Sequence, residues 1–321
     1  MNALRFTGNR LELQNIPQPS NDSEALVRVV KSGICNTDLE IINGYAGFQG
    51  TIGHEFVGVV EESARDSPWI GKRVVGEINV GCGVCGLCIG GDARHCSARS
   101  VLGIHGRDGC HAEYLRLPVE NLLEVPANVS NDQAVFAEPL AAAFGIAEQV
   151  EILPETKVAV IGDGKLGLLC AMCAALKSDN VTLIGKHKSK MAKATGNNIE
   201  RVLLANISNG LHRYFDVVIE ASGSESGFAT ALDLLKPRGK LVLKSTFHGK
   251  PAWEASRVVV DEITIIGSRC GRFEPALDLL AKRQVRVDQL IDDELSLQDG
   301  VKAIEKAGEK GVLKVLLTMD S

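Results

Sequence analysis

Four cysteines within one short glycine-rich segment are the strongest chemical signal in this sequence of 321 residues. The spacing C-x2-C-x2-C-x7-C is formed by Cys82, Cys85, Cys88 and Cys96. Four thiolates at about 2.3 Å from a Zn²⁺ ion make a closed tetrahedral site, and glycines let the backbone wrap the ion. Because no position remains for water or substrate, the spacing predicts a structural zinc ion. The alternatives are reactive or disulfide-bonded cysteines and an iron–sulfur cluster, which uses the same type of ligand.

A second set of metal-binding side chains precedes this loop. The segment GICNTD, residues 33–38, contains Cys35, and the segment GHE, residues 53–55, contains His54 and Glu55. A lone cysteine is more often a small buried hydrophobe, and a lone histidine is more often a hydrogen-bonded residue. A catalytic zinc needs about three protein ligands and one open position, and Cys35 and His54 would supply two of the ligands. Their joint presence beside a zinc loop favours this interpretation.

Glu138 is a further candidate ligand, because it is a carboxylate inside an otherwise apolar stretch, residues 134–147. A buried charge in such a stretch requires a partner, and a metal ion would be one. The alternative is that Glu138 is salt-bridged or caps a helix that begins at Pro139.

A glycine-rich turn later in the chain has the pattern G-x-G-x-x-G, formed by Gly162, Gly164 and Gly167. It follows an apolar strand-like run and opens a helix-like segment that begins with Lys165 and Leu166. In this setting the glycines permit a tight turn and a close approach to a pyrophosphate, and the helix N-terminus favours anionic oxygens. The turn therefore predicts a dinucleotide site.

The next strand-like run, residues 181–184, bears on the choice of dinucleotide. An NAD site usually has Asp or Glu at the end of this strand, where it binds the ribose hydroxyls. Here the run is followed, after one glycine, by Lys186, His187 and Lys188. These side chains would accommodate a 2′-phosphate, so the sequence favours NADP over NAD. The alternative is that the lysines are ordinary solvated residues at a helix start.

The order of strand-like and helix-like segments predicts the frame that positions these residues. Up to about Pro126, short β-like runs are broken by Gly and Pro, which predicts an antiparallel β domain with long loops. These runs cover residues 25–30, 56–60, 73–75 and 113–117. From Thr156 on, apolar strand-like runs alternate with helix-like segments such as 166–176 and 227–235, which predicts a doubly wound parallel sheet. The strand-like runs cover residues 157–161, 181–184, 201–204, 216–220, 240–243 and 263–266.

The last part of the chain, after Gly271, offers two helices, over residues 274–282 and 297–306, and a strand over 314–317. These elements are too few for a domain of their own, so we expect them to pack on the N-terminal part. Arg269, just after the last strand of the parallel sheet, could contact a cofactor phosphate or form an ordinary salt bridge.

Composition narrows the class of partner. Hydrophobic residues make up 45% of the chain and charged residues 23%, which is typical of a globular protein. The formal net charge of −5 favours a small-molecule partner over nucleic acid or an anionic membrane, both of which need concentrated Lys and Arg. No stretch reaches the roughly 18 apolar residues of a spanning helix. With cysteines spaced for metal rather than for disulfides, we expect a reducing compartment, the cytoplasm.

Taken together, the motifs resemble the zinc-dependent medium-chain dehydrogenase family, which includes alcohol, polyol and threonine dehydrogenases. Five motifs match in order over nearly the whole chain: G-x-C-x-T-D at 33–38, G-H-E at 53–55, the four-cysteine loop, E-P-L at 138–140 and G-x-G-x-x-G at 162–167. The resemblance implies a chaperonin-10-like β domain and a six-stranded Rossmann domain. We place the catalytic zinc-binding domain at residues 1–140 and 272–321 and the Rossmann domain at 141–271.

The resemblance also implies a ligand set for the catalytic metal. Cys35 and His54 would be zinc ligands. Glu138, as in the polyol and sugar dehydrogenase branch, would be a ligand or would hold the zinc-bound water. Glu55 corresponds to a direct ligand in some members and to a neighbouring carboxylate in others, so the third ligand stays open.

Residues around these ligands carry further implied roles. Asp38 would orient His54 through the second ring nitrogen. Thr37 would provide the hydroxyl that takes the proton from the substrate alcohol. Two positions depart from the family pattern: Glu40 stands where many relatives have a histidine that ends a proton relay, and Asn36 stands where alcohol dehydrogenases often have an arginine that contacts pyrophosphate.

The function that this resemblance implies is hydride transfer between a secondary alcohol, polyol or sugar and NAD(P) through a zinc-bound alkoxide, because zinc lowers the pKa of the alcohol. We expect two zinc ions per chain, one catalytic and one structural, a preference for NADP, and a homodimer or homotetramer. The alternatives are a non-catalytic redox sensor on the same fold and a zinc-independent quinone or enone reductase. A zinc-ribbon nucleic-acid module fits only the cysteine loop.

Overall fold

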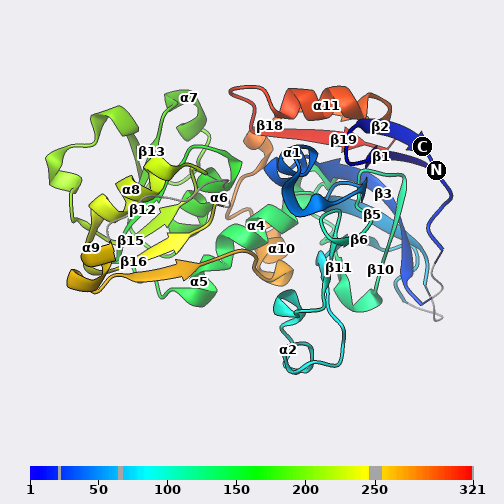
Figure 1. Cartoon of the computed structure of the whole chain (residues 1–321), viewed down its shortest axis with the longest axis horizontal. Helices are drawn as coiled ribbons and strands as arrows, with labels where there is room; N and C mark the ends of the chain where they lie inside the picture. Colours follow the sequence, from blue (N-terminus) through cyan, green and yellow to red (C-terminus); the bar gives the residue numbers. More distant parts are fainter. Residues whose placement is uncertain (21–22, 64–67, 246–254, 320–321) are drawn as a thin grey trace. The chain divides into compact units, whose positions relative to one another are not determined.

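The chain folds into two compact units, seen in a computed structural model that describes residues 1–20, 23–63, 68–245 and 255–319 (Figure 1). The first unit consists of Met1–Glu138, Ala276–Lys282 and Val287–Ser321. The second unit consists of Pro139–Pro275 and Arg283–Arg286.

The first unit is built mainly from antiparallel strands. Its largest sheet has the order β11-β6-β5-β3-β19-β18, and β10 also pairs with β3. Those strands are β3 (Ala25–Gly33), β5 (Glu55–Glu62), β6 (Arg73–Gly76), β10 (Tyr114–Leu117), β11 (Leu122–Glu124), β18 (Ile291–Ser296) and β19 (Lys314–Thr318). Two smaller sheets contain β1 (Asn2–Phe6), β2 (Leu11–Asn15) and β4 (Gly50–Thr51), and β7 (Asn79–Val80), β8 (Ser100–Leu102) and β9 (Gly106–Arg107). The predicted strands over 25–30, 56–60 and 73–75 lie within these elements, and the one over 113–117 begins one residue before β10.

The C-terminal segment returns to the first unit, as predicted. Strand β19 pairs antiparallel with β3, with Leu316 opposite Gly33. Helix α11 (Gly300–Ala307) packs on β19, and its buried Ile304 joins a core cluster with Ile34 and Val315. The other helices of this unit are α1 (Asn36–Ile42), α2 (Gly86–Ile89), α3 (Asn131–Ala134) and most of α10 (Phe273–Ala281).

The second unit contains a six-stranded parallel sheet in the order β14-β13-β12-β15-β16-β17. Its strands are β12 (Lys157–Ile161), β13 (Asn180–Gly185), β14 (Ile199–Leu203), β15 (Phe215–Glu220), β16 (Leu235–Leu243) and β17 (Thr264–Gly267). Its helices are α4 (Ala137–Phe144), α5 (Ile146–Gln149), α6 (Lys165–Ala174), α7 (Lys188–Met191), α8 (Glu225–Leu234) and α9 (Ala255–Val260). The order reverses at β12, so right-handed crossovers place α6 and α8 on opposite faces of the sheet. This is the predicted doubly wound Rossmann fold.

Two helix limits differ from prediction for local reasons. Helix α8 ends at Leu234, and Leu235 already belongs to β16, because Pro237 lacks an N–H and pushes the residue before it toward extended backbone. Helix α4 begins at Ala137 rather than at Pro139, which suits a proline because the first helical N–H groups have no partner within the helix. Glu138 therefore lies inside the first turn and does not cap the helix from outside.

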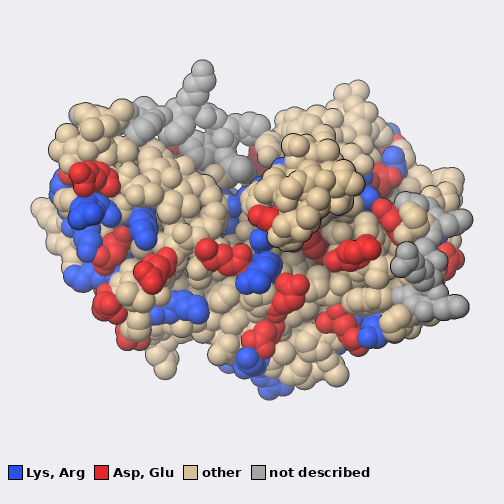
Figure 2. Space-filling view, turned by 90° about the horizontal axis from the view of Figure 1, so that it is seen from below, with Lys and Arg blue, Asp and Glu red and all other residues tan. Residues whose placement is uncertain are grey.

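Lys and Arg side chains are interspersed with Asp and Glu on the face drawn in Figure 2, rather than gathered in one basic area among the described residues. None of the helices in the described parts of the chain has the length and apolar character needed to cross a membrane.

Candidate functional site

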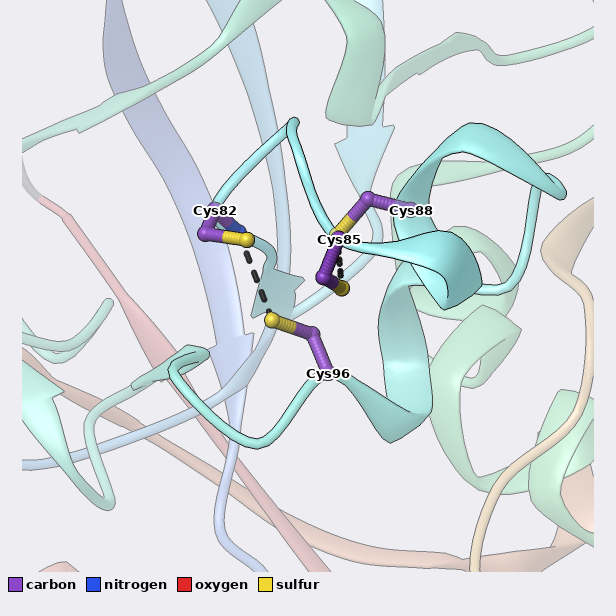
Figure 3. A group of neighbouring side chains, drawn as sticks. All are labelled: Cys82, Cys85, Cys88 and Cys96. Carbon is purple, nitrogen blue, oxygen red and sulfur yellow. Dashed lines mark hydrogen bonds between the residues drawn. The ribbon is translucent and has the colours of Figure 1, made fainter.

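The four cysteines of the glycine-rich loop meet at one point. The sulfur atoms of Cys82, Cys85, Cys88 and Cys96 all lie within 4.8 Å of one another, and Figure 3 shows them turned toward a common centre. The sulfurs of Cys85 and Cys88 are 3.5 Å apart. That spacing is near the edge of about 3.8 Å expected for four sulfurs around zinc, and it exceeds the bond of about 2.0 Å in a disulfide. The geometry fits a tetrahedral metal ion.

The loop around these cysteines is shaped for close packing of sulfur and backbone. A Cβ atom at Gly81 would lie 2.6 Å from the sulfur of Cys88, so a larger residue would displace that ligand. Backbone N–H groups of Val84 and Cys85 lower the pKa of Cys82 to about 6, whereas desolvation raises the pKa of Cys88 to about 11. A bound cation would lower the pKa values of the thiols and so keep all four cysteines as thiolates at neutral pH.

A second group of potential ligand atoms, from Cys35, His54 and Glu55, also lies within 4.8 Å of one another. Strand pairing explains the approach: Cys35 follows the end of β3, His54 precedes β5, and the two strands pair with Gly33 opposite Glu55. A Cβ atom at Gly33 would lie 2.5 Å from Oε2 of Glu55, so glycine is required there. His54 and Glu55 are 3% and 0% exposed, so an ion held here would be shielded from bulk water.

Asp38 ties the two ligand segments together. Its fully buried carboxylate accepts the backbone N–H of Cys35 at 2.8 Å and that of Gly53 at 3.1 Å. One carboxylate oxygen also lies 3.4 Å from Nδ1 of His54, which leaves Nε2 as the ring nitrogen available to an ion. Burial opposes ionisation, but the imidazoles of His54 and His111 hold the pKa of Asp38 well below its ordinary value. Burial likewise disfavours the imidazolium, yet Asp38 and Cys35 raise the pKa of His54 well above its ordinary value.

In the described parts of the chain, only one of the two carboxylate oxygens of Glu55 has a partner, which is a buried lysine. Its Oε2 pairs with Nζ of Lys314, and both side chains are 0% exposed. The same Nζ lies 3.3 Å from the carbonyl oxygen of Ile34 and 5.4 Å above the ring of Phe136. The other carboxylate oxygen, Oε1, is buried and has no hydrogen-bond partner. Such an orphaned oxygen next to a thiol and an imidazole fits a bound metal ion.

Glu138 lies outside that group of three but is electrostatically linked to it. Desolvation raises the pKa of Glu138 to about 7, the charge of His54 opposes the rise, and the carboxylates of Glu55 and Glu77 add to it. Among the described residues, the group whose ligand atoms all lie within 4.8 Å of one another includes Glu55 and does not include Glu138.

The two residues expected to move protons both lie on helix α1. The hydroxyl of Thr37 is 3.6 Å from the sulfur of Cys35, so it is next to the ligand group. Glu40 is half-buried on the same helix. Asn36, at the first position of α1, is exposed.

The glycine turn of the second unit is open where a ligand would approach and tight elsewhere. Gly162 has φ +122°, and a Cβ atom there would lie 2.5 Å from the carbonyl oxygen of Ala221. A Cβ atom at Gly167 would lie 2.1 Å from the carbonyl oxygen of Gly162. Gly164, which precedes α6, has open space around it and provides no side-chain cap. The first N–H groups of α6, from Lys165 and Leu166 onward, therefore fit an anionic group such as pyrophosphate.

The segment after β13 is fixed by a carboxylate from that same turn. One oxygen of Asp163 accepts the backbone N–H of Lys186 at 2.7 Å and that of His187 at 2.6 Å, and it lies 3.0 Å from Nδ1 of the His187 ring. The side chains of Lys186, His187 and Lys188 are exposed. Arg269 is also exposed, and its carbonyl oxygen accepts a hydrogen bond from Lys244 at 3.0 Å.

Three residues of these sites have no counterpart in the sequence-based prediction. Lys314 begins the otherwise apolar strand β19, and this setting is the signal that its charge must be paired. His111 is a single histidine without any metal-ligand spacing. Asp163 fills a variable position of the glycine motif. Each acts through tertiary contacts, so the only available signal was a polar residue within an apolar or constrained segment.

Comparison with known proteins places this geometry in a family. The family "Alcohol dehydrogenase GroES-like domain" matches residues 21–127, and "Zinc-binding dehydrogenase" matches residues 166–282. A sorbitol dehydrogenase of Halalkalibacterium halodurans is 29% identical over 328 residues, with 95% of each chain covered.

Solved structures give the same result. A putative zinc-binding dehydrogenase from Sinorhizobium meliloti bound to NADP has a TM-score of 0.89 and 27% identity, covering 99% of this chain and 98% of that one. A protein from Escherichia coli described as a short chain alcohol dehydrogenase, complexed with NADH, has a TM-score of 0.89 and 26% identity, covering 99% of each chain. With a GroES-like and a zinc-binding dehydrogenase domain matched in order, this chain belongs to the zinc-dependent medium-chain dehydrogenase family.

Proposed function

We propose that the protein transfers a hydride between a secondary alcohol, polyol or sugar and a nicotinamide dinucleotide, with a catalytic zinc ion at Cys35 and His54. The observation that supports this most directly is a half-buried thiol within 4.8 Å of a buried imidazole and a buried carboxylate, with one carboxylate oxygen lacking a hydrogen-bond partner. Similarity to a sorbitol dehydrogenase favours a polyol among the substrate classes.

Glu55 is the third ligand that we favour. One of its oxygens is held by Lys314 and the other is without a partner, so the side chain is both fixed and able to accept an ion. Glu138 is the alternative third ligand, and its charge interactions with His54 and Glu55 support a role beside the metal.

When bound, the zinc ion supplies Lewis acidity, which lowers the pKa of an alcohol near it. The protein's own residues handle orientation and the proton. Asp38 fixes both ligand segments and faces Nδ1 of His54. The hydroxyl of Thr37 accepts the alcohol proton while it passes its own proton on, so it acts as a relay. Glu40, further along the same helix, passes the proton onward in place of the histidine that many family members have.

We also propose a structural zinc ion, which is held by the four-cysteine loop. Its four sulfurs leave no ligand position for a substrate, so it would stabilise the loop and take no part in the reaction. The proposal is therefore two zinc ions per chain, and a count near one ion per chain would favour the non-catalytic redox sensor instead.

For the dinucleotide we propose NADP over NAD. Related structures contain either NADP or NADH, so similarity alone does not decide. Lys186, His187 and Lys188 supply positive charge after β13, and Asp163 fixes where that segment begins. Arg269 is a candidate for a further phosphate contact.

The cofactor proposal is tested by charge reversal. Lys186→Glu combined with Lys188→Glu should lower the ratio of kcat/KM for NADP over NAD by about 10- to 100-fold, since each reversed charge near the phosphate costs about 1 kcal/mol. Lys302→Glu with Lys310→Glu, two exposed lysines of the first unit, makes the same change in net charge and should leave the ratio unchanged. An unchanged ratio in the first pair would exclude these lysines from cofactor choice.

The reaction itself is tested with a panel of polyols, sugars and secondary alcohols, read by nicotinamide absorbance with NAD and with NADP. We expect turnover with at least one polyol or sugar and about two zinc ions per chain by elemental analysis. A protein that carries both ions and binds dinucleotide but oxidises none of the panel would contradict the substrate class. Turnover that survives complete removal of metal would favour the zinc-independent reductase.

We further propose a homodimer or homotetramer, located in the cytoplasm. The spacing of Cys82, Cys85, Cys88 and Cys96 for a metal ion rather than for disulfides supports a reducing compartment. Light scattering of the purified chain measures the assembly.

A further inference from the structure

His111 is a second buried histidine against the carboxylate that faces His54. Its ring is 0% exposed, and its Nε2 lies 3.5 Å from Oδ2 of Asp38. Its other ring nitrogen, Nδ1, is 2.7 Å from the hydroxyl of Ser32, which is also fully buried. Asp38 therefore lies between two imidazoles, with His54 at Oδ1 and His111 at Oδ2.

The ring of His111 is fixed from several sides. A Cβ atom at Gly53 would lie 2.5 Å from two atoms of the His111 ring, so the imidazole packs directly against the backbone that precedes His54. The segment 109–111 also runs along the chain before His54: the N–H of Gly109 donates to Thr51, that of Cys110 to Gly53 and that of His111 to Ile52, at 2.7, 2.9 and 3.0 Å. His111 cannot turn away without disturbing that segment.

The two ring nitrogens that face Asp38 have the same surroundings on either side of the carboxylate. Each Asp38 oxygen accepts one backbone N–H, and each faces one imidazole nitrogen. Both nitrogens, Nδ1 of His54 and Nε2 of His111, are buried and have no hydrogen-bond partner of their own in the described chain. At 3.4 and 3.5 Å both contacts are slightly longer than a normal hydrogen bond, so the carboxylate of Asp38 is nearly equidistant from the two rings. The position of Asp38 is thus a balance between the two rings.

We propose that His111 is a positioning residue for the metal site: it holds Asp38 from the side opposite His54 and so sets the orientation of the His54 ring toward the metal. Carboxylates behind a ligating histidine fix its tautomer and ring orientation, and their loss costs about 10- to 100-fold in metal affinity. His111 extends that support by one more residue, anchored on Ser32. The inference rests on the proposed function, because it takes His54 as a ligand.

A purely structural His111 would behave differently. It would fill the core beside Gly53 and satisfy Ser32, so its replacement would lower stability while the metal's surroundings stayed the same. The two roles are therefore separated by a readout that reports the metal environment rather than the fold.

The test uses His111→Phe, which keeps an aromatic ring and removes both nitrogens, and His111→Gln, which keeps polar atoms able to reach Ser32 and Asp38. The full-length proteins are loaded with Co²⁺. The visible absorption of the second site, formed by Cys35, His54 and Glu55, is isolated by subtracting the spectrum of His54→Ala. Zn²⁺ affinity at that site is measured by chelator competition. Leu115→Ala, a buried residue of nearby β10, is the matched control for lost packing.

We expect His111→Phe to weaken Zn²⁺ binding at the second site by about 10-fold or more and to shift its cobalt bands, with the four-cysteine site unaffected. His111→Gln should recover most of the affinity, Ser32→Ala should give a smaller loss, and Leu115→Ala should lower stability alone. Unchanged affinity and spectrum in folded His111→Phe would overturn the inference. If His111→Phe does not fold, unchanged affinity and spectrum in Ser32→Ala would overturn it. If His54→Ala itself removed no metal, the proposed function would fail first, and the two failures are thereby distinguished.

Discussion

The two clusters of candidate metal ligands in the first unit are built in opposite ways. The four-cysteine cluster draws all its ligands from one loop, and three of its four cysteines are at least partly exposed. The cluster of Cys35, His54 and Glu55 is assembled by the pairing of β3 with β5, has two of its three side chains buried, and is supported by Asp38 and by Lys314 from the far end of the chain. A closed, local site suits a structural ion, whereas a buried site with an unpaired oxygen and long-range support suits chemistry.

The largest expected effect is the loss of activity when a ligand of the cluster of Cys35, His54 and Glu55 is replaced. Cys35→Ser or His54→Ala should lower kcat by about 10³-fold or more, because a catalytic metal contributes several kcal/mol to stabilising the transition state. Dinucleotide binding, followed by quenching of protein or nicotinamide fluorescence, should stay within about 2-fold, since the glycine turn lies in the other unit. A folded variant with full turnover would remove this cluster from the reaction.

The buried ion pair of the second cluster gives the next effect. Lys314→Met leaves Glu55 as an uncompensated buried charge and should lower the free energy of unfolding of the metal-free protein by about 3–5 kcal/mol, measured by urea denaturation. Zn²⁺ should restore part of the loss, because a cation again faces the carboxylate. Lys302→Met, which breaks an exposed pair with Asp299, is the control and should change stability by less than about 1 kcal/mol. Equal losses in both variants would mean that burial of Glu55 has no special cost.

Loss of one ligand from the four-cysteine cluster should affect stability rather than chemistry. Cys96→Ser should remove one metal ion per chain and lower Tm by about 5–10 °C, equivalent to about 2–3 kcal/mol in a protein of this size. The initial kcat of the folded protein should stay within about 3-fold of the unaltered enzyme. Cys270→Ser, outside both clusters, should change neither metal content nor Tm appreciably. A collapse of kcat at full folding would contradict a purely structural ion.

The same contrast explains what could be predicted from the sequence. The four-cysteine cluster was predicted in full, because its ligands are close in sequence and their spacing alone fixes the geometry. The strands of the parallel sheet were predicted to within a few residues, apart from the first half of β16, because apolar runs mark them locally. In the first unit, strands such as β1, β2, β11 and β18 were not predicted. Cys35 and His54 were predicted to share a metal, and the structure brings them together with Glu55. Lys314 and His111 were missed, because their contacts depend on β19 pairing with β3 and on segment 109–111 packing along residues 51–53.

The smallest expected effect is the pH dependence of stability that arises from Glu138, and it tests whether this residue lies beside the ligand cluster. In the metal-free protein the pKa of Glu138 is raised from its ordinary 4.5 to about 7, chiefly by desolvation. The folded state then holds a proton that the unfolded chain releases earlier, so this stabilisation is complete below about pH 4.5 and is lost as pH rises through about 7. Because the side chain is partly exposed, the loss should be on the order of 2 kcal/mol.

Urea denaturation of the metal-free protein at several pH values between about 5 and 8 measures this loss. Glu138→Gln cannot ionise, so its free energy of unfolding should fall less over that range, while Glu120→Gln, at an exposed site, should follow the unaltered protein. Added Zn²⁺ should flatten the profile of the unaltered protein, because a nearby cation favours the charged carboxylate and brings the folded pKa down. An identical pH profile for Glu138→Gln and Glu120→Gln would show that Glu138 is not desolvated beside the ligand cluster, and Glu55 would then stand alone as the third ligand.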